Sequence, residues 1–140
     1  AAGFIEADQV PGPWRRLCAL PALFVGLLYD QSSLDAAWDL VKHWTAEERQ
    51  ALRDAVPREA LHAKIRGRSV QDIAQDVLAI ARAGLEARGL QGCKGRTEAA
   101  FLDVLDETAA TGRTAAENLL ALYTGSWGGN IERVFRDFAY

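Results

Sequence analysis

Two groups of basic side chains are the strongest candidates for binding chemistry in this sequence. The first group, Lys64, Arg66 and Arg68, lies in a short basic loop that leads directly into an expected helix. Free N–H groups at a helix N-terminus favour an anion, so this loop could hold a phosphate or a carboxylate. The alternative, which the sequence favours, is that the three cations are solvated around a flexible Gly67.

The second group stands at the start of a long apolar run. Arg15 and Arg16 are adjacent, and a guanidinium presents two parallel donors that suit a carboxylate. Trp14 beside them offers a flat apolar wall, so these three residues are candidates for binding a substrate. Their alternative role is to mark the solvated end of a helix and to pair with surface acids, and local chemistry alone favours that role.

Other kinds of site chemistry are poorly represented. His43 and His62 have no partner at metal-ligand spacing, and no GxSxG, Walker or GxGxxG motif occurs. The carboxylates of Asp30, Asp35 and Asp39 are close in sequence, but they are typical of helix starts and of a solvated helix face. The sequence therefore predicts no catalytic residue and no metal ligand.

The run from Leu17 to Tyr29 carries no charge, and the other elements must be arranged around it. A helix that is apolar on every side has to be surrounded by other elements or by a membrane. The run is shorter than the roughly 20 residues that cross a bilayer. We therefore expect a buried central helix in a soluble core, with a kink or restart near Pro21.

Capping signals and apolar periodicity predict the remaining elements. Further helices are expected to follow the cap signals at 32–33, 45, 69, 97 and 114, and a last one is expected from 131 to 140. A glycine-rich loop at 89–95 is expected to be exposed and mobile. Because no βαβ alternation occurs, the sequence predicts an all-α fold, with residues 1–140 forming a single domain of about six or seven helices.

Composition excludes several classes of protein. The hydrophobic fraction of 49% and the charged fraction of 25% are those of an average globular domain. A net charge of -3 and a pI near 5.4 give no electrostatic footprint for nucleic acid or an anionic membrane. Cys18 and Cys93 form no disulfide framework, which favours a reducing cytoplasm, although a single bridge between them stays open. The lack of any methionine suggests a fragment or a processed product.

Several stretches follow the pattern of a known family. The most specific are Pro13–Ala22 and Val25–Asp30, and weaker collinear matches follow at 44–57, 111–114 and 116–135. On these residues the chain resembles the C-terminal part of the plant and proteobacterial type of glutamate-cysteine ligase. One departure lies at Glu6, which is followed at once by Ala7-Asp8 where the family has an arginine in between.

The resemblance implies an enzyme that uses ATP and magnesium to activate the γ-carboxylate of glutamate as an acyl phosphate. The amine of cysteine then attacks, in the first step of glutathione synthesis. It also implies a catalytic sheet like that of glutamine synthetase, which belongs upstream of this chain, so no cofactor is expected within the chain itself. Trp14, Arg15 and Arg16 match the family motif best and are expected at the edge of the substrate pocket.

Two functions follow as hypotheses. The preferred one is a helical portion of a glutamate-cysteine ligase that is inactive alone and is completed by other sequence, with glutamate, cysteine and ATP as ligands of the whole enzyme. The alternative is a freestanding, non-catalytic helical module that binds or regulates a catalytic partner chain. Neither hypothesis involves nucleic acid or a membrane.

Overall fold

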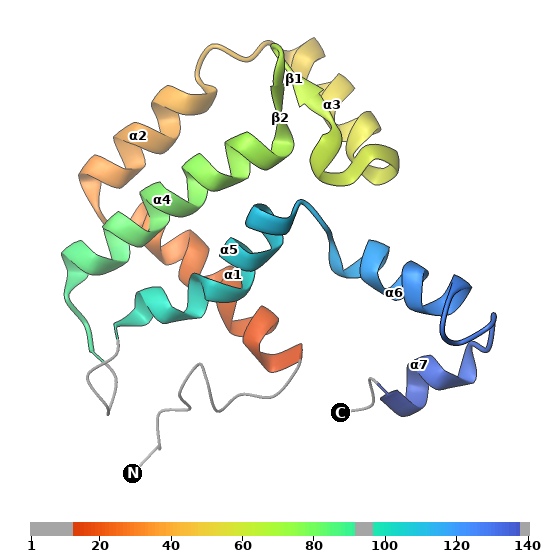
Figure 1. The fold of residues 1–140 in the computed structure, drawn as a ribbon. Coiled ribbons are helices and arrows are strands. Elements are labelled where there is room, and N and C mark those ends of the chain that lie inside the picture. Colours follow the sequence, from red (N-terminus) through yellow and green to blue (C-terminus); the bar gives the residue numbers. More distant parts are fainter. Residues whose placement is uncertain (1–12, 92–96, 138–140) are drawn as a thin grey trace.

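A computed structural model describes residues 13–91 and 97–137 of the chain (Figure 1). In these residues it contains seven α-helices, two short 3-10 helices and one antiparallel two-stranded hairpin, which confirms the all-α class. The α-helices are α1 (Pro13–Leu28), α2 (Gln31–Val41), α3 (Ala46–Glu59), α4 (Val70–Arg88), α5 (Asp103–Thr111), α6 (Ala115–Thr124) and α7 (Glu132–Asp137). The 3-10 helices are η1 (Ala60–His62) and η2 (Glu98–Leu102), and the strands are β1 (Lys64–Ile65) and β2 (Arg68–Ser69).

The core forms where α4 packs across α1. Small side chains line this crossing, with Ala22 of α1 and Ala81 of α4 buried. Gly26 and Gly84 lie where the two backbones meet and leave no room for a Cβ atom. Close approach of two helices requires such small residues, so these four positions determine where α1 lies against α4.

Larger side chains fill the core between α4 and the η2–α5 segment. Leu85 and Leu102 are its largest fully buried side chains in the described part of the chain. The sequence pattern favours Phe101, Val104 and Leu105 as inward residues of this segment; all three are half-buried, and Phe101 and Leu105 pack against the core. The first five residues of the segment form a 3-10 helix, which turns faster than an α-helix and brings Leu102 inward as well.

Polar contacts also hold α5 against α4. The amide of Gln71 donates a hydrogen bond to the Ala109 carbonyl at 2.8 Å, and that of Gln75 donates to the same oxygen at 3.2 Å. Arg82 of α4 forms salt bridges with Asp103 and Asp106 of α5. These contacts fix the position of α5 relative to α4.

The predicted capping boxes at three helix starts are confirmed. The pairs Thr45/Glu48, Ser69/Asp72 and Thr114/Glu117 open α3, α4 and α6 in turn, each with the hydroxyl accepting a backbone N–H and the carboxylate accepting the reciprocal one. Gly89 and Gly112 end α4 and α5 in the left-handed conformation that favours glycine after a helix.

The start of α2 differs from the prediction. Asp30 is the N-cap, because its carboxylate accepts the Ser33 backbone N–H at 2.9 Å. Ser33, which the sequence suggested as a cap residue, is instead buried, and its hydroxyl donates to the Ile80 carbonyl at 3.2 Å. Ser33 therefore joins α2 to α4.

The prediction that α1 is buried on every side is wrong. Only one face of α1 meets α4, α2 and η2, and the opposite face exposes Leu17, Leu20, Phe24 and Leu28. The predicted restart near Pro21 is also absent, since α1 continues through it. Pro21 withholds a hydrogen bond from the Leu17 carbonyl, and because both residues are exposed, water can satisfy that oxygen.

Two further segments differ from the sequence prediction. The basic segment is a hairpin rather than a loop, with Ile65 paired to Arg68 and with positive φ angles at Arg66 and Gly67 in its turn. The sequence also favours a break of the third helix at Pro57, but α3 continues through this residue and ends at Glu59. The mobile loop expected at 89–95 and the last three residues of the expected final helix lie largely outside the described residues.

The α6 and α7 helices form an arm that extends away from the rest of the molecule (Figure 1). No residue of α6 is buried. Among the described residues of the arm, one is buried: Trp127, in the turn between the two helices. The arm joins α5 through a short connection that contains Arg113.

The lengths and compositions of the described helices bear on membrane crossing. No single helix among them is both long and apolar enough to cross a bilayer. Residues Arg16–Leu28 of α1 and the whole of α2 are together long and apolar enough, but the two helices are bent by 95° relative to each other.

Candidate functional site

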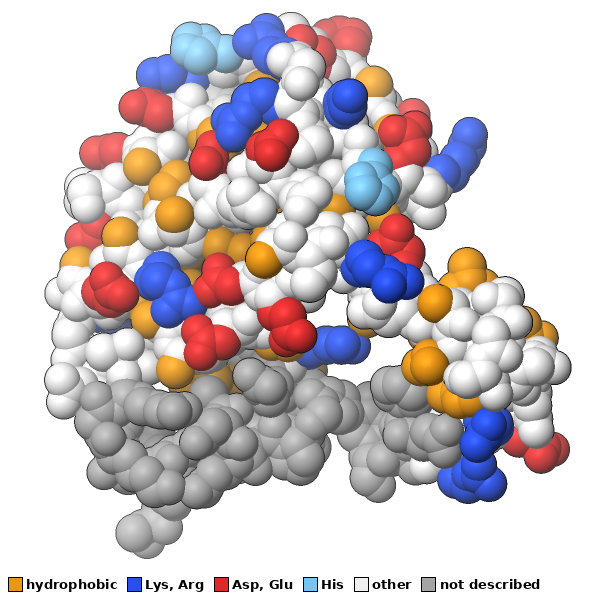
Figure 2. Space-filling view, in the orientation of Figure 1, with side chains coloured by type: hydrophobic (Ala, Val, Ile, Leu, Met, Phe, Trp, Pro, Cys, Tyr) orange, Lys and Arg blue, Asp and Glu red, His pale blue; other side chains and the backbone are white. Residues whose placement is uncertain are grey.

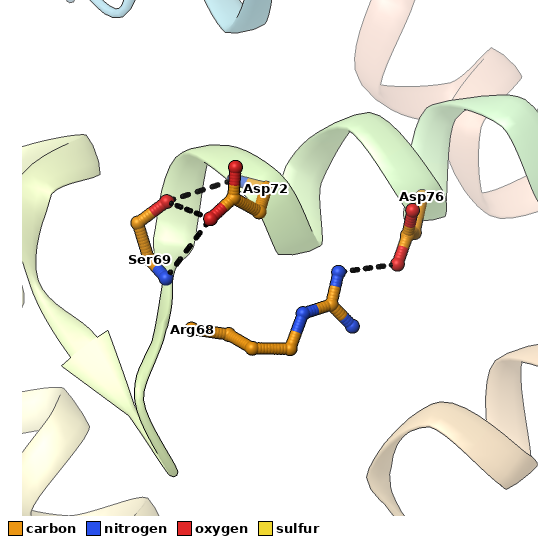
Figure 3. Close-up of polar contacts among 4 residues, drawn as sticks. All are labelled: Arg68, Ser69, Asp72 and Asp76. Atoms are coloured by element: carbon orange, nitrogen blue, oxygen red, sulfur yellow. Dashed lines mark hydrogen bonds and ion pairs between the residues drawn. The ribbon is translucent and has the colours of Figure 1, made fainter.

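The basic hairpin does not present three free cations. Arg68 is bound to Asp76 of α4, with 2.6 Å between Nη2 and Oδ2 (Figure 3). Arg66 is bound to Glu48 of α3, with 2.8 Å between Nε and Oε1. Lys64 is exposed on β1. The two guanidiniums therefore already have carboxylate partners.

The start of α4 next to the hairpin also has its own anion. Figure 3 shows the Asp72 carboxylate turned back toward Ser69. It accepts one hydrogen bond from the Ser69 hydroxyl at 2.6 Å and one from the Ser69 backbone N–H at 3.3 Å. These hydrogen bonds, that of the hydroxyl first, lower the pKa of Asp72 below its ordinary value. The Ser69 N–H and hydroxyl are thus already bound by a carboxylate of the chain. Anion binding at Lys64, Arg66 and Arg68 stays a prediction.

Arg16 lies in a different setting. It is exposed on the first turns of α1 and lines a hollow of about 260 Å³. α1 includes Trp14 and Arg15, but their side chains fall outside what the structure describes. Of the three residues predicted to bind substrate, Arg16 alone can therefore be placed.

The hollow lies between the start of α1, the outer side of α5 and the first turn of α6. Its lining consists of two arginines, one carboxylate, three hydroxyl or amide side chains and two small apolar ones, namely Arg16, Val104, Glu107, Thr108, Thr111, Arg113, Ala115 and Asn118. Such a mixture of cations and hydrogen-bonding groups suits a small ligand that carries a carboxylate.

The two arginines give the hollow its charge. Neither forms a salt bridge within the described part of the chain. Arg113 lies near Glu117, whose pKa is lowered mainly by the hydrogen bond from the Thr114 backbone N–H and to a lesser degree by the charge of Arg113. Among the described lining residues Glu107 is the one carboxylate, so these residues together carry a net positive charge.

Sequence reasoning did not group Arg113 with Arg16. Thr111-Gly112-Arg113-Thr114 was a recognisable match to the family, but nothing local connected it with Arg16 at the other end of the chain. Gly112 makes the connection possible, because its left-handed conformation ends α5 and turns the chain toward α6. Thr111 and Ala115 on either side of this turn both line the hollow.

The described residues contain no cluster of candidate metal ligands. No group of three His, Cys, Asp or Glu side chains there could hold a metal ion. Acidic residues such as Glu48, Asp72 and Glu117 are instead engaged in capping their helices. Cys18 is a free, half-buried thiol.

Comparison with known proteins identifies the family. A family model described as glutamate-cysteine ligase family 2 (GCS2) matches residues 7–137. The chain belongs to this family. The resemblance that Pro13–Ala22 and Val25–Asp30 suggested is thereby confirmed.

Curated relatives agree over nearly the whole chain. It is 48% identical over 129 residues to the chloroplastic glutamate-cysteine ligase of Arabidopsis thaliana, and 46% identical to that of Nicotiana tabacum. The chloroplastic glutamate-cysteine ligase A of Oryza sativa subsp. japonica is 43% identical over 129 residues. These alignments cover 92% of this chain but only 24–25% of each relative. The chain thus spans about a quarter of the length of the relatives that it matches.

The expected cytoplasmic location is contradicted by these relatives. The ligases from Arabidopsis thaliana, Nicotiana tabacum and Solanum lycopersicum are all named chloroplastic. The expectation rested on the sparse use of cysteine, which indicates a reducing environment but does not distinguish one reducing compartment from another.

Proposed function

We propose that this chain is the helical portion of a ligase that joins the γ-carboxylate of glutamate to the amine of cysteine. The main support is that 43–48% identity extends over 92% of the chain to enzymes named glutamate-cysteine ligases. ATP and magnesium are needed to activate the carboxylate in the family, and in this proposal they bind to parts of the enzyme beyond this chain.

The proposal includes a role for the hollow between α1, α5 and α6. Arg16 and Arg113 would bind the non-reacting carboxylate of an amino-acid substrate. Asn118 and Thr108 would supply hydrogen bonds to the same substrate. The support is that two guanidiniums from distant parts of the sequence line one hollow without salt bridges of their own among the described residues. In this proposal Trp14 and Arg15 remain candidates for the edge of the same pocket.

The chain alone is proposed to be catalytically incomplete. It corresponds to about a quarter of the relatives' length, and the carboxylates that open α3, α4 and α6 already serve as helix caps. The binding of ATP and the transfer of its phosphoryl group would therefore depend on the rest of the ligase.

A chimeric enzyme tests the proposal. The 129 aligned residues of the Arabidopsis thaliana ligase are replaced by those of this chain, and ATP-dependent formation of the dipeptide from glutamate and cysteine is measured. We expect the chimera to be active and the isolated chain to be inactive, without heat of ATP binding in calorimetry. Circular dichroism of both proteins controls for folding.

Each alternative result contradicts a specific part of the proposal. A folded but inactive chimera would contradict the assignment to the ligase. Nucleotide binding or dipeptide synthesis by the isolated chain would contradict its incompleteness. Binding of the isolated chain to the intact Arabidopsis enzyme, together with an inactive chimera, would favour the non-catalytic regulatory module.

A further inference from the structure

The α1 helix has apolar residues on two opposite faces. Its inner face, with Ala19, Ala22 and Gly26, is buried against the core. Its outer face carries Leu17, Leu20, Phe24 and Leu28, which we call the outer stripe. These four positions are spaced by three, four and four residues and so lie along one side of the helix.

The outer stripe is more than half exposed in the structure. Between 53% and 62% of the surface of each of its four residues is exposed. The sequence holds no charged residue from Leu17 to Tyr29, so no charged side chain of α1 lies within this stripe. A contiguous apolar surface of this kind is typical of an interaction site.

Another surface helix of the same molecule shows the contrast. α3 has no buried residue, but its sequence AEERQALRDAVPRE is mostly charged or polar, as expected for a helix that faces water. The outer stripe therefore differs from an ordinary solvent-facing helix surface.

The arm repeats the pattern of the outer stripe. Leu120 is 60% exposed and Phe135 is 72% exposed, and Figure 2 shows hydrophobic side chains gathered over the arm. A helix of ten residues such as α6 is marginal in water without packing. Two separate elements of the described chain thus present apolar surface that their own domain does not cover.

We propose that the outer stripe is the surface on which the remaining three quarters of the ligase pack. This inference rests on the proposed function, because it takes the occupant from the relatives, of whose length the chain covers 24–25%. A partner of that size is large enough to cover both the stripe and the arm. Leu17 directly follows Arg16, so the covered surface reaches the hollow and places its ligand next to the rest of the enzyme.

Cysteine labelling tests the inference independently of activity. Phe24→Cys and, as a second probe, Leu20→Cys are made with Cys18 and Cys93 replaced by alanine. The matched control is Arg53→Cys on α3, where the side chain is exposed. The rate of maleimide labelling at each site is measured by peptide mass spectrometry in the isolated chain and in the Arabidopsis chimera.

We expect the thiols introduced by Phe24→Cys and Leu20→Cys to react at least tenfold more slowly in the chimera than in the isolated chain. The thiol of Arg53→Cys should react equally in both. Equal rates at the stripe positions in the two proteins would overturn the inference. So would labelling of the isolated chain that slows as its concentration rises, because a second copy would then occupy the stripe. If labelling of the stripe positions slowed only when phosphatidylcholine vesicles were added, the inference would also be overturned, in favour of a lipid surface.

The test separates this inference from the proposed function. A chimera that protects the introduced thiol at position 24 but forms no dipeptide supports the docking surface and contradicts the ligase assignment. A chimera that forms dipeptide while that thiol stays reactive contradicts the docking surface alone. Circular dichroism of each variant ensures that reactivity does not reflect unfolding.

Discussion

A Cβ atom added to Gly84 would overlap the carbonyl oxygen of Gly26. The reverse addition at Gly26 would place a Cβ atom on the Ala81 carbonyl oxygen. The backbones of α1 and α4 are therefore in direct contact, and neither position has space for a methyl group. This contact is the centre of the fold, because the inner face of α1 and the buried side of α4 both meet there.

Gly84→Ala should destabilise the chain strongly. The methyl group meets rigid backbone rather than a flexible side chain, so the two helices must move apart. Overpacking of a core typically costs about 1–3 kcal/mol, and we expect a loss at or above the upper end of that range. Urea unfolding followed by circular dichroism measures it.

Gly89→Ala is the matched control for that substitution. Gly89 has a positive φ of 64° but nothing within 4 Å of an added Cβ, so only backbone strain of about 1–2 kcal/mol is expected. If Gly84→Ala were no more destabilising than Gly89→Ala, the direct contact between the α1 and α4 backbones would be contradicted.

Truncation of single apolar side chains should distinguish the buried core from the exposed outer stripe of α1. Leu85→Ala removes a fully buried side chain and should cost about 2–5 kcal/mol. Phe24→Ala should cost less than about 1.5 kcal/mol in the isolated chain, because Phe24 is half exposed. Comparison of the two urea midpoints checks this, and equal losses would show that the outer stripe is covered.

Acid should weaken the starts of three helices. The folded-state pKa values of Glu48, Asp72 and Glu117 are lowered, first by the Arg66 hydrogen bond, the Ser69 hydroxyl and the Thr114 N–H respectively. A lowered pKa stabilises the folded state above the unfolded-state pKa, near 4, and this stability is lost as pH falls through the folded-state value. Unfolding free energies at pH 7, 5, 4 and 3 should therefore decline below about pH 4.5.

Substitution identifies the groups responsible for that decline. Glu117→Gln keeps the shape of the side chain but cannot ionise, so this variant should show a shallower loss between about pH 5 and pH 3. A variant as acid-sensitive as the parent would exclude the capping box of α6 as a source. Glu59→Gln is the control, because Glu59 takes no part in a capping box.

The two arginines of the hollow should act on substrate binding together. In the active chimera, Arg113→Gln should raise KM for one amino-acid substrate by about 10-fold to 100-fold, the expected effect of losing a hydrogen bond to a charged group. Arg16→Gln should act on the same substrate, and the double variant should lose less than the product of the two effects. Arg53→Gln on α3 should change nothing. Effects on different substrates would contradict a shared carboxylate site.

The sequence predicted local features well because their signals are local. A Thr or Ser followed three residues later by an acid specifies a capping box through hydrogen bonds within one turn, as at Thr114 and Glu117. The helix end at Gly112 is likewise a local signal, because glycine adopts the left-handed conformation found there without steric cost. These features do not depend on where the helix lies in the fold.

Features that depend on tertiary contacts could not be predicted in the same way. The apolar run of α1 contains no information on which faces this chain covers, so Phe24 was expected inside and lies half outside. Arg66 and Arg68 looked like free cations because their partners, Glu48 and Asp76, are on other elements. The hollow was missed because its two arginines come from distant parts of the sequence.

The connection between α5 and α6 gives the hollow a further property. One wall contains Thr108 and Thr111 of α5, and α5 is held against α4 by the hydrogen bonds from Gln71 and Gln75. The other wall contains Ala115 and Asn118, which belong to the arm. The separation of the two walls therefore depends on the direction of the arm. A ligand that bridges Arg16 and Arg113 would restrict that direction, and a protein surface that holds the arm would change the affinity for the ligand. Thermodynamic linkage requires these two effects to be equal in free energy.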